Sequence, residues 1–370
     1  MESDFMGKIL VVTHYTEIPG TSHHLMRYLK QKGIDATFLL LPLDKWKNLT
    51  YKIIRISENK EMELEKKYPN TYFTDVFFII PNTLKNWELY IGVDPLNALV
   101  GGILKKILNK KWTVIFYSVD YSPDRFSNRL INTIYSFIDR VAVKYSDYIW
   151  CTSRRMIYAR AKQVSDLSKI IYVPNGTWNN YRRLKKKSNN DNINLVFVGY
   201  IGKQFDLYLF ISEVNKRERI KLHIIGDGPM REYLEAVANK ENVKFYGKYP
   251  HDQVLRILTE KKLIGIAPYN KKVSHVLYGS PLKIIEYLSC GLPVITSDVV
   301  EIAKDIKRYK CGFVYSTPEQ LKKILDKIEY SRFKYNKLSK NAIKLAKKFY
   351  WTHIYDRAFE RVLNQDTINR

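Results

Sequence analysis

The sequence predicts an α/β protein made of two doubly wound parallel-sheet domains in series. Apolar strand-like runs alternate with helix-like runs, and many of the strands are apolar on both faces, as parallel sheets covered by helices require. A basic, polar stretch then interrupts this alternation, which starts again after it. The 370 residues exceed what one ordinary core holds. We expect a first domain at 1–183, a linker at 184–192 and a second domain at 193–349.

The first domain is expected to begin with a strand at 8–15 and a helix at 22–33, with Ser22 as N-cap and Gly33 as the stop. Residues 45–75 show no clear pattern and are interpreted as an irregular insertion. Asp94 precedes a proline, so it is expected to cap the next helix. The other elements expected here are strands at 36–43, 88–93, 112–119, 148–153 and 169–175 and helices at 94–108 and 126–146.

The second domain repeats the pattern with six apolar strands and helices between them. Ligands of such sheets bind at the carboxyl ends of the strands, and with two domains the cleft between them is the natural site. The expected strands are 193–200, 221–227, 242–247, 263–269, 293–298 and 311–316.

The composition is that of a globular protein, with 45% hydrophobic and 27% charged residues. No apolar run approaches the roughly 20 residues that a membrane span needs. The N-terminus has acidic residues and no cleavage signal, so we expect a cytoplasmic protein. Cys151, Cys290 and Cys311 lie far apart in apolar runs and are expected to be reduced core thiols.

The net charge of +25 should draw the chain to polyanions. An anionic membrane surface is favoured over nucleic acid, and peripheral attachment at the inner face of the membrane is expected. The basic stretch at 102–112, GILKKILNKKW, is one candidate for this contact. The alternative is that the excess charge is the solvated surface of ordinary helices.

Glycines follow three strands of the second domain. The first turn contains Gly199, Gly202 and Lys203, the second begins at Gly226, and the third contains Gly247. Such turns let backbone N–H groups approach a phosphate, and a lysine adds charge. A single turn of this kind can be purely structural, but three at one sheet edge indicate an anion site.

The stretch GSPLKIIEYLSCGLPVIT, residues 279–296, is mostly apolar but contains a cation and a carboxylate on one helix face, Lys283 and Glu286. Ser280 and Pro281 precede the helix, whose first N–H groups and dipole favour an anion. A phosphate at Lys283 and ribose hydroxyls at Glu286 would satisfy both side chains. The alternative is a local ion pair, worth about 0.3–0.5 kcal/mol.

Two further polar residues end strands of the first domain, His14 and Asp120. His14 fits either a substrate contact or a hydrogen-bonded structural histidine. Asp120 is the candidate general base if the chemistry needs one. The sequence contains no Asp-x-Asp pair and no histidine spacing typical of metal ligands, so we expect no metal and no cofactor.

Several stretches together resemble the GT-B glycosyltransferases of the family 4-like, group 1 type. They are FVGYIGKQFD, IGDGPMREYLE, NVKFYGKYPHDQVLRIL, IAPY and SPLKIIEYLSCGLPVI, with VDYSPDRF, YSDYIWCTS and VPNG in the first domain. The resemblance covers most of the chain and is weakest over 45–90. It implies two Rossmann-like domains facing across a cleft, and a C-terminal helix at about 350–370 that packs back on the first domain.

The resemblance also implies roles. Glu286 would bind the donor ribose, while Pro281, Leu282 and Lys283 would line the diphosphate. Asp120 and His14 would face the acceptor side. The remaining residues implied on the donor side are Gly199, Gly202, Lys203, Gly226, Tyr249 and Ser280.

One position departs from the family pattern. Retaining members usually have an acidic residue eight positions before the helix glutamate, and Tyr278 stands there instead. Retention or inversion of configuration therefore stays open.

The sequence thus predicts a metal-independent glycosyltransferase that moves a sugar from a nucleotide-diphosphate donor to a glycan or lipid-linked acceptor. Two alternatives remain. The same fold serves nucleotide-sugar epimerases, and a basic chain can be a non-enzymatic nucleic-acid binder, although no nucleic-acid module is recognised.

Overall fold

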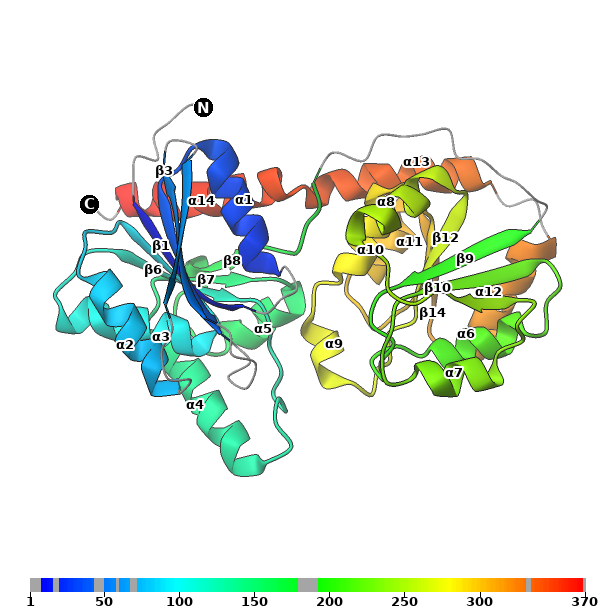
Figure 1. Cartoon of the computed structure of the whole chain (residues 1–370), viewed down its shortest axis with the longest axis horizontal. Helices are drawn as coiled ribbons and strands as arrows, with labels where there is room; N and C mark the ends of the chain where they lie inside the picture. The colour runs from blue at the N-terminus through cyan, green and yellow to red at the C-terminus, as the bar shows by residue number, and fades with distance from the viewer. Residues whose placement is uncertain are drawn as a thin grey trace. The chain divides into compact units, whose positions relative to one another are not determined.

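The computed structural model contains two compact units, one of residues Met1–Pro174 with Tyr355–Arg370 and one of residues Asn175–Ile354 (Figure 1). The first unit thus ends at Pro174, where the sequence had suggested 183. Most of the expected linker at 184–192 lies outside the described residues. Each unit has its own sheet, which confirms the expected α/β class with two sheet domains. The structure describes residues 8–15, 20–42, 50–57, 60–66, 72–178, 192–330 and 334–368.

The sheet of unit 1 has the order β4-β3-β2-β1-β5-β6-β7-β8. Its strands are parallel except at one edge, where β3 and β4 run antiparallel to their neighbours. The strand order reverses direction between β1 and β5, which is the switch point of this sheet. The strands are β1 Ile9–Tyr15, β2 Ala36–Pro42, β3 Tyr51–Ser57, β4 Lys60–Lys66, β5 Leu89–Val93, β6 Thr113–Ser118, β7 Tyr148–Cys151 and β8 Ile170–Tyr172.

The irregular insertion expected at 45–75 is wrong over the described residues. They form β3, β4 and the start of helix α2, Tyr72–Thr83. In β3, apolar and polar residues nearly alternate, and β4, KEMELEK, is a charged edge strand whose lysines and glutamates discourage further strand pairing. The alternation of apolar and polar residues is hard to recognise in the sequence because both strands are rich in charged residues.

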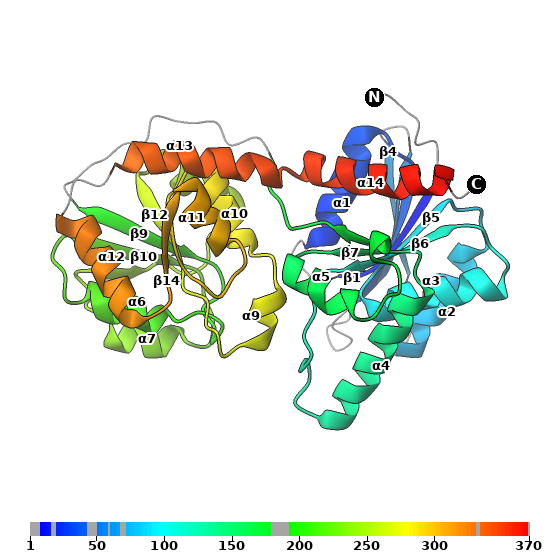
Figure 2. The ribbon, with the colours of Figure 1, turned by 180° about the vertical axis from the view of Figure 1, so that it is seen from behind.

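Helices cover both faces of the unit 1 sheet (Figures 1 and 2). Helices α2 to α5 pack on the face that contains Val114 and Phe116, and α1 and α14 pack on the face that contains Tyr117 and Trp150. On the second face the ring of Tyr28 stacks on Phe359 of α14. These helices are α1 Thr21–Lys32, α3 Pro95–Ile107, α4 Arg129–Tyr145, α5 Arg154–Ala161 and α14 Trp351–Ile368, with a short 3-10 helix at Leu167–Lys169.

Unit 2 has a wholly parallel sheet in the order β11-β10-β9-β12-β13-β14. The strand order reverses between β9 and β12, so this is the switch point of the second sheet. The strands are β9 Ile193–Val198, β10 Ile220–Ile225, β11 Val243–Phe245, β12 Leu263–Ala267, β13 Val294–Ser297 and β14 Gly312–Tyr315.

Two layers of helices cover the unit 2 sheet. Helices α8, α10, α11 and α13 share one apolar core with the sheet, and α6, α7 and α12 share the other. The helices are α6 Leu207–Val214, α7 Arg231–Val237, α8 His251–Glu260, α9 Ser274–Tyr278, α10 Leu282–Ser289, α11 Ala303–Tyr309, α12 Pro318–Tyr330 and α13 Tyr335–Ala346, with a 3-10 helix at Lys347–Phe349 before α14.

Two expected helix caps differ in the structure. The N-cap of α1 is Gly20, and Ser22 lies inside the helix. Asp94 does occupy the N-cap position of α3, but its side chain makes no cap hydrogen bond, and its φ is 78°. In α1 the Gly20 N–H donates to His23 Nδ1, so the helix starts at a glycine and not at the expected serine.

Helix α14 begins in unit 2 and continues on unit 1. Its first residue, Trp351, is buried and donates its N–H to the Thr177 carbonyl at 3.0 Å. Further along, Tyr355 and Phe359 pack against Trp150 in the core of unit 1. Unit 1 is therefore completed by residues from the far end of the chain.

Within the part of the chain that the structure describes, none of the helices is both long enough and apolar enough to cross a membrane. Cys151, Cys290 and Cys311 are buried and form no disulfide with one another, as expected of core thiols.

Candidate functional site

Three glycine-containing turns meet at the switch point of unit 2. The Gly199 N–H donates to the Ile225 carbonyl at 2.9 Å, and the Gly226 N–H donates to the Gly247 carbonyl at 2.7 Å. Gly199 and Gly226 have φ values of 123° and 147°, and a Cβ on Gly226 would collide with the Gly199 carbonyl. The N–H groups of these two glycines are thus bonded inside the protein and are not offered to a phosphate as expected, and the lack of a Cβ lets the turns pack closely together.

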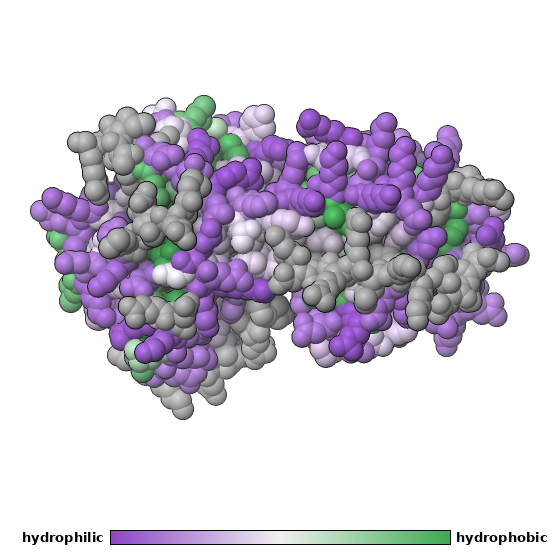
Figure 3. Space-filling model, turned by 90° about the horizontal axis from the view of Figure 1, so that it is seen from above, coloured by the Kyte–Doolittle hydropathy of each residue, from purple (hydrophilic) through white to green (hydrophobic). Residues whose placement is uncertain are grey.

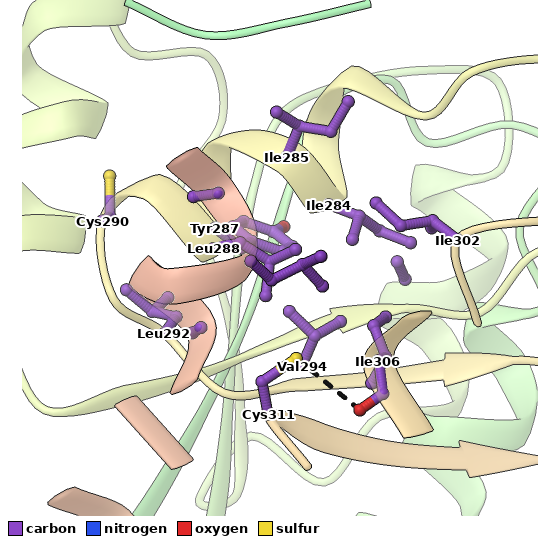
Figure 4. Close-up of a cluster of buried hydrophobic side chains, with 14 of the residues drawn as sticks. Ile284, Ile285, Tyr287, Leu288, Cys290, Leu292, Val294, Ile302, Ile306 and Cys311 are labelled. Atoms are coloured by element: carbon purple, nitrogen blue, oxygen red, sulfur yellow. Dashed lines mark hydrogen bonds between the residues drawn. The ribbon is translucent and has the colours of Figure 1, made fainter. Parts of the chain in front are cut away.

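Helix α10 is fixed across this edge by its apolar face. Ile284, Ile285 and Leu288 are buried in the core of unit 2 (Figure 4). The Tyr287 hydroxyl accepts the N–H of Val198, the last residue of β9, at 2.7 Å. Gly265 of β12 makes room for the Tyr287 ring, because a Cβ there would collide with it. The first turn of α10 is therefore held over the switch point.

Lys283 reaches from α10 to the first glycine turn. A Cβ on Gly199 would lie 3.3 Å from its Nζ. The Nζ is buried, has no hydrogen-bond partner, and lies 3.5 Å and 3.7 Å from the ring centroids of Phe197 and Phe205. Desolvation by burial lowers the pKa of Lys283 well below its usual range, and the charge of Glu286 opposes this only partly. The structure thus buries an amino group that has no hydrogen-bond partner and whose protonated form lacks a counter-charge.

Glu286 lies one turn further along α10 and is 31% exposed. Its Oε1 is 3.7 Å from Nε2 of His251, which is itself well exposed. Burial raises the pKa of the Glu286 carboxyl above its usual value, and the charges of His251 and Lys283 offset only part of this rise. Because the Lys283 Nζ has no hydrogen-bond partner, the local Lys283–Glu286 pair that the sequence left open is not formed as a hydrogen-bonded bridge. The Glu286 carboxylate is partly exposed and open to a ligand, whereas the Lys283 Nζ is buried without a hydrogen-bond partner.

The segment before α10 is held by Asn175, and the sequence did not predict this contact. The Asn175 N–H donates to Ser280 Oγ at 3.0 Å, and its side-chain Nδ2 donates to the Ser280 carbonyl at 2.8 Å. Asn175 belongs to the VPNG stretch, which was noticed only as a landmark. The next residue, Gly176, packs on the Phe349 carbonyl so closely that a Cβ would meet it at 2.6 Å. The sequence signal for this contact was Asn175 followed by Gly176 shortly after a strand.

The remaining predicted donor residues line the same part of unit 2. Lys203 is exposed in the turn after β9, and its carbonyl accepts the Asn270 side chain at 3.4 Å. Tyr249 is partly buried in the loop before α8 and packs on the α10 core. Tyr278, at the position where the family acid would stand, ends α9. Gly202 lies in the turn with Lys203, and Pro281 and Leu282 begin α10.

Unit 1 has its own polar cluster at the switch point between β1 and β5. His14, near the end of β1, is 11% exposed, and its Nε2 lies 3.4 Å from the Oδ2 of Asp75. The other Asp75 oxygen accepts the Tyr51 hydroxyl at 2.7 Å. The Nδ1 of His14 lies 3.1 Å from Asn97 Nδ2 and 3.9 Å from Asp94 Oδ2. His14 is therefore a mostly buried residue whose two ring nitrogens both have polar partners, and it lies at this edge of the sheet.

The carboxylates decide the charge of His14. Burial alone would lower its pKa, but the hydrogen bonds and charges of Asp75 and Asp94 outweigh burial and raise the pKa of His14 to about 9. This contact explains why the Asp94 side chain makes no cap hydrogen bond, because its carboxylate lies toward His14. The backbone of Asp94 has a φ of 78°, which is unfavourable for a residue other than glycine.

Asp120 lies at the same edge of the unit 1 sheet, in the exposed loop that follows β6. The strand next to β6 is β5, so Asp120 and Asp94 follow neighbouring parallel strands. Among the residues described, no three His, Cys, Asp or Glu side chains converge as metal ligands would.

Comparison with known proteins identifies the second unit. Residues 181–345 match the family model described as glycosyl transferases group 1. A curated relative from Xanthomonas campestris pv. campestris, UDP-glucuronate:glycolipid 2-beta-glucuronosyltransferase, is 28% identical over 160 residues. That match covers 43% of this chain and 37% of the relative's length. The resemblance to group 1 glycosyltransferases is therefore confirmed.

Solved structures confirm the fold over nearly the whole chain. HepE of Anabaena in complex with UDP-glucose has a TM-score of 0.72 at 14% identity, with 97% of this chain and 100% of that chain covered. Sucrose-phosphate synthase of Thermosynechococcus elongatus has a TM-score of 0.73 at 14% identity, with 98% and 100% covered. The chain has the GT-B fold.

Proposed function

Since residues 181–345 form a group 1 glycosyltransferase domain, we propose that the chain transfers a sugar from a nucleotide-diphosphate donor to a glycan or lipid-linked acceptor. One observation carries the donor assignment: the buried Lys283 Nζ has no hydrogen-bond partner, and it lies beside a glycine turn and the start of a helix. A diphosphate supplies such a partner, and its charge would return Lys283 to the protonated state.

The donor ribose is assigned to Glu286. Its carboxylate is partly exposed one helical turn from Lys283, and vicinal hydroxyls are good donors to such a carboxylate. HepE of Anabaena, which shares the fold, was solved with UDP-glucose, and the name of the curated relative specifies a UDP-sugar donor. We therefore propose a nucleoside diphosphate sugar, with UDP as the first base to test.

We propose that no metal ion holds the diphosphate. The support is that the sequence has no Asp-x-Asp pair and that Lys283 can act as the counter-ion. Transfer activity that survives EDTA would agree with this, whereas activity restored only by a divalent cation would refute it.

Unit 1 is assigned the acceptor. His14 near the end of β1 and Asp120 after β6 lie at the same sheet edge, and we propose that Asp120 deprotonates the acceptor hydroxyl while the charged His14 orients groups. The curated relative's name specifies a glycolipid acceptor, which supports a lipid-linked acceptor here. The net charge of +25 supports an anionic membrane as the place of reaction.

The test is nucleotide binding by calorimetry. Lys283→Met should weaken UDP or GDP binding about 10- to 100-fold, because one charge-assisted contact is worth about 1.5–3 kcal/mol. Glu286→Gln should weaken it about tenfold or less for the nucleoside part. Lys304→Met on α11 and Glu260→Gln on α8 are matched exposed controls that should bind as the wild type does.

If both site variants bind UDP and GDP as tightly as the wild type, the donor assignment is wrong. The epimerase alternative is separated by incubation with the sugar nucleotide alone. An altered sugar without transfer would favour it, whereas intact donor that is consumed only with an acceptor supports the transferase.

A further inference from the structure

Arg160 of helix α5 is a charged residue in the interior of unit 1. The face of the molecule drawn in Figure 3 is mainly hydrophilic, as expected where charged side chains meet solvent. Arg160, in contrast, is 0% exposed, and its ion-pair partner Asp139 of α4 is 5% exposed. A buried pair of this kind is often no more stabilising than apolar side chains of the same volume. Stability alone therefore does not explain why the pair is there.

The guanidinium of Arg160 is fixed by hydrogen bonds from both of its terminal nitrogens. Its Nη1 donates to Asp139 Oδ2 and, at 3.0 Å, to Gln163 Oε1. Its Nη2 donates to Asp139 Oδ1 and to Ser118 Oγ, each at 2.8 Å. Ser118 is the last residue of β6. The rigid planar fork of the arginine thus ties α4 and α5 to the end of the strand that precedes Asp120.

The residues on either side of Asp120 are held by the core of unit 1. The Val119 carbonyl accepts the Thr152 hydroxyl at 3.1 Å. The Tyr121 ring lies over the Arg160 guanidinium, with 4.8 Å between the guanidinium carbon and the ring centroid. Val119 and Tyr121 are half-buried, whereas Asp120 between them is exposed. The backbone is thus fixed on both sides of an aspartate that stays accessible.

The rest of the loop between β6 and α4 is attached to α4 itself (Figure 1). The Asn132 side chain donates to the Pro123 carbonyl at 2.7 Å. The rings of Phe126 and Tyr135 pack edge to face, with their centroids 5.5 Å apart. Asp139 lies one turn beyond Tyr135 on the same helix. The ion pair therefore anchors the helix on which this loop rests.

We propose that Arg160 is a positioning residue that sets the direction of Asp120 toward the acceptor hydroxyl. With Asp139 it forms a rigid support for the loop, so the base does not have to be ordered when the acceptor binds. The inference rests on the proposed function and deepens it, since it explains how an exposed loop can hold a general base in one place.

Arg160→Lys tests this role, because lysine keeps the charge but cannot hold Asp139 and Ser118 with one planar group. Turnover is measured as UDP release from UDP-glucose, UDP-galactose or UDP-glucuronate, with a panel of octyl glycosides as acceptors. We expect kcat to fall about 10- to 100-fold and the Kd for UDP to stay within about twofold, because a small displacement of a base slows the reaction without affecting the donor site. The matched control is Arg217→Lys in unit 2, another buried arginine paired with carboxylates, which should leave kcat unchanged.

A double-mutant cycle with Asp120→Asn separates positioning from a purely structural role. If Arg160 acts through Asp120, Arg160→Lys should lower kcat by about twofold or less once the base is gone. A role in stability alone would give the same loss of kcat with and without Asp120.

Hydrogen exchange of the loop gives a readout that does not depend on turnover. In Arg160→Lys the amides of residues 119–126 should exchange about tenfold faster, while those of β9 in unit 2 should exchange as in the wild type. Tyr121→Leu removes the ring from the guanidinium without changing a buried charge, so it keeps the test possible if Arg160→Lys does not fold. This variant should lower kcat about tenfold.

The inference is overturned by any of four results. The first is a wild type that transfers sugar while the variants of Arg160 and Tyr121 turn over as fast as it does. The others are equal losses in both arms of the cycle, Asp120→Asn with wild-type kcat, and loop amides whose exchange does not change in Arg160→Lys. The first of these refutes the positioning role and leaves the proposed function intact. A wild type that neither binds UDP nor releases it from any of these donors refutes the proposed function itself.

Discussion

The two sheets place a titratable cation at the same topological position but treat it in opposite ways. His14 lies at the switch point of unit 1 between the carboxylates of Asp75 and Asp94. Lys283 lies at the switch point of unit 2 between the rings of Phe197 and Phe205, and no acceptor reaches its Nζ. The pKa of His14 is raised to about 9, whereas that of Lys283 is lowered.

This difference indicates which edge awaits a charged ligand. Unit 1 already contains the anions that its cation needs, so its edge suits an uncharged group such as an acceptor hydroxyl. Unit 2 lacks them, and an entering anion would remove an unfavourable desolvation. Variants that remove one of these charged groups at a time test this difference between the two units.

The largest effect is expected for Asp75→Ala. The carboxylate is 1% exposed and serves both His14 and Tyr51, so its removal takes one hydrogen-bond partner from each of these two side chains. We expect unit 1 to lose roughly 3 kcal/mol of stability. Urea unfolding with hydrogen exchange of the β1 amides measures it, with exposed Asp124→Ala as the control. A loss below about 1 kcal/mol would contradict the pairing.

The next effect is a pH dependence of stability. Because the folded pKa of His14 is raised above its usual 6.5 to about 9, its contribution is complete below pH 6.5 and is lost as the pH rises through 9. We expect a loss of about 1–3 kcal/mol across this window. His14→Gln should flatten the curve there, and exposed His275→Gln should not. Equal slopes in wild type and His14→Gln would show that the carboxylates do not hold a charged imidazole.

A smaller effect of opposite sign is expected in unit 2. Lys283→Met replaces a desolvated amino group with a thioether of similar length between the same two rings. We expect the ligand-free protein to gain about 1 kcal/mol, because a buried polar group without a hydrogen-bond partner is removed. Thermal unfolding without nucleotide checks this, and a clear loss of stability would mean that the ring contacts outweigh desolvation.

The smallest signal is a proton taken up with the nucleotide. A diphosphate near Lys283 should raise the depressed pKa of the free protein, so binding should take up as much as about one proton at mildly alkaline pH. Calorimetry in two buffers of different ionisation enthalpy measures the uptake. It should vanish in Lys283→Met and persist in Glu286→Gln. Uptake that survives Lys283→Met belongs to another group.

Much of the fold follows from local patterns. The strands are continuous apolar runs, and the helices between them are amphipathic, so the two sheets could be predicted. The edge strands β3 and β4 could not, because charged residues at an edge strand hide its alternation; Met62 and Leu64, the apolar residues of β4, remain exposed. Local patterns thus report burial, and they fail where a strand is hardly buried.

The candidate site was predictable in part. Lys283 and Glu286 stood out because charge is unexpected in an apolar helix. The partners of His14 did not, since Asp75 and Asn97 come from helices 61 and 83 residues away. Asp94 followed a good capping rule and was still drawn to His14. Such contacts depend on tertiary structure, and no short window of sequence contains them.

The course of α14 has a practical consequence for dissecting the enzyme. A gene fragment that stops at Pro174 would encode every strand of the unit 1 sheet. It would lack Tyr355 and Phe359, whose rings pack against Tyr28 and Trp150. To express this half alone, one would have to splice the final segment back on. Because Tyr355 and Phe359 pack against Tyr28 and Trp150, residues 355–359 are a poor place for a truncation or an internal tag.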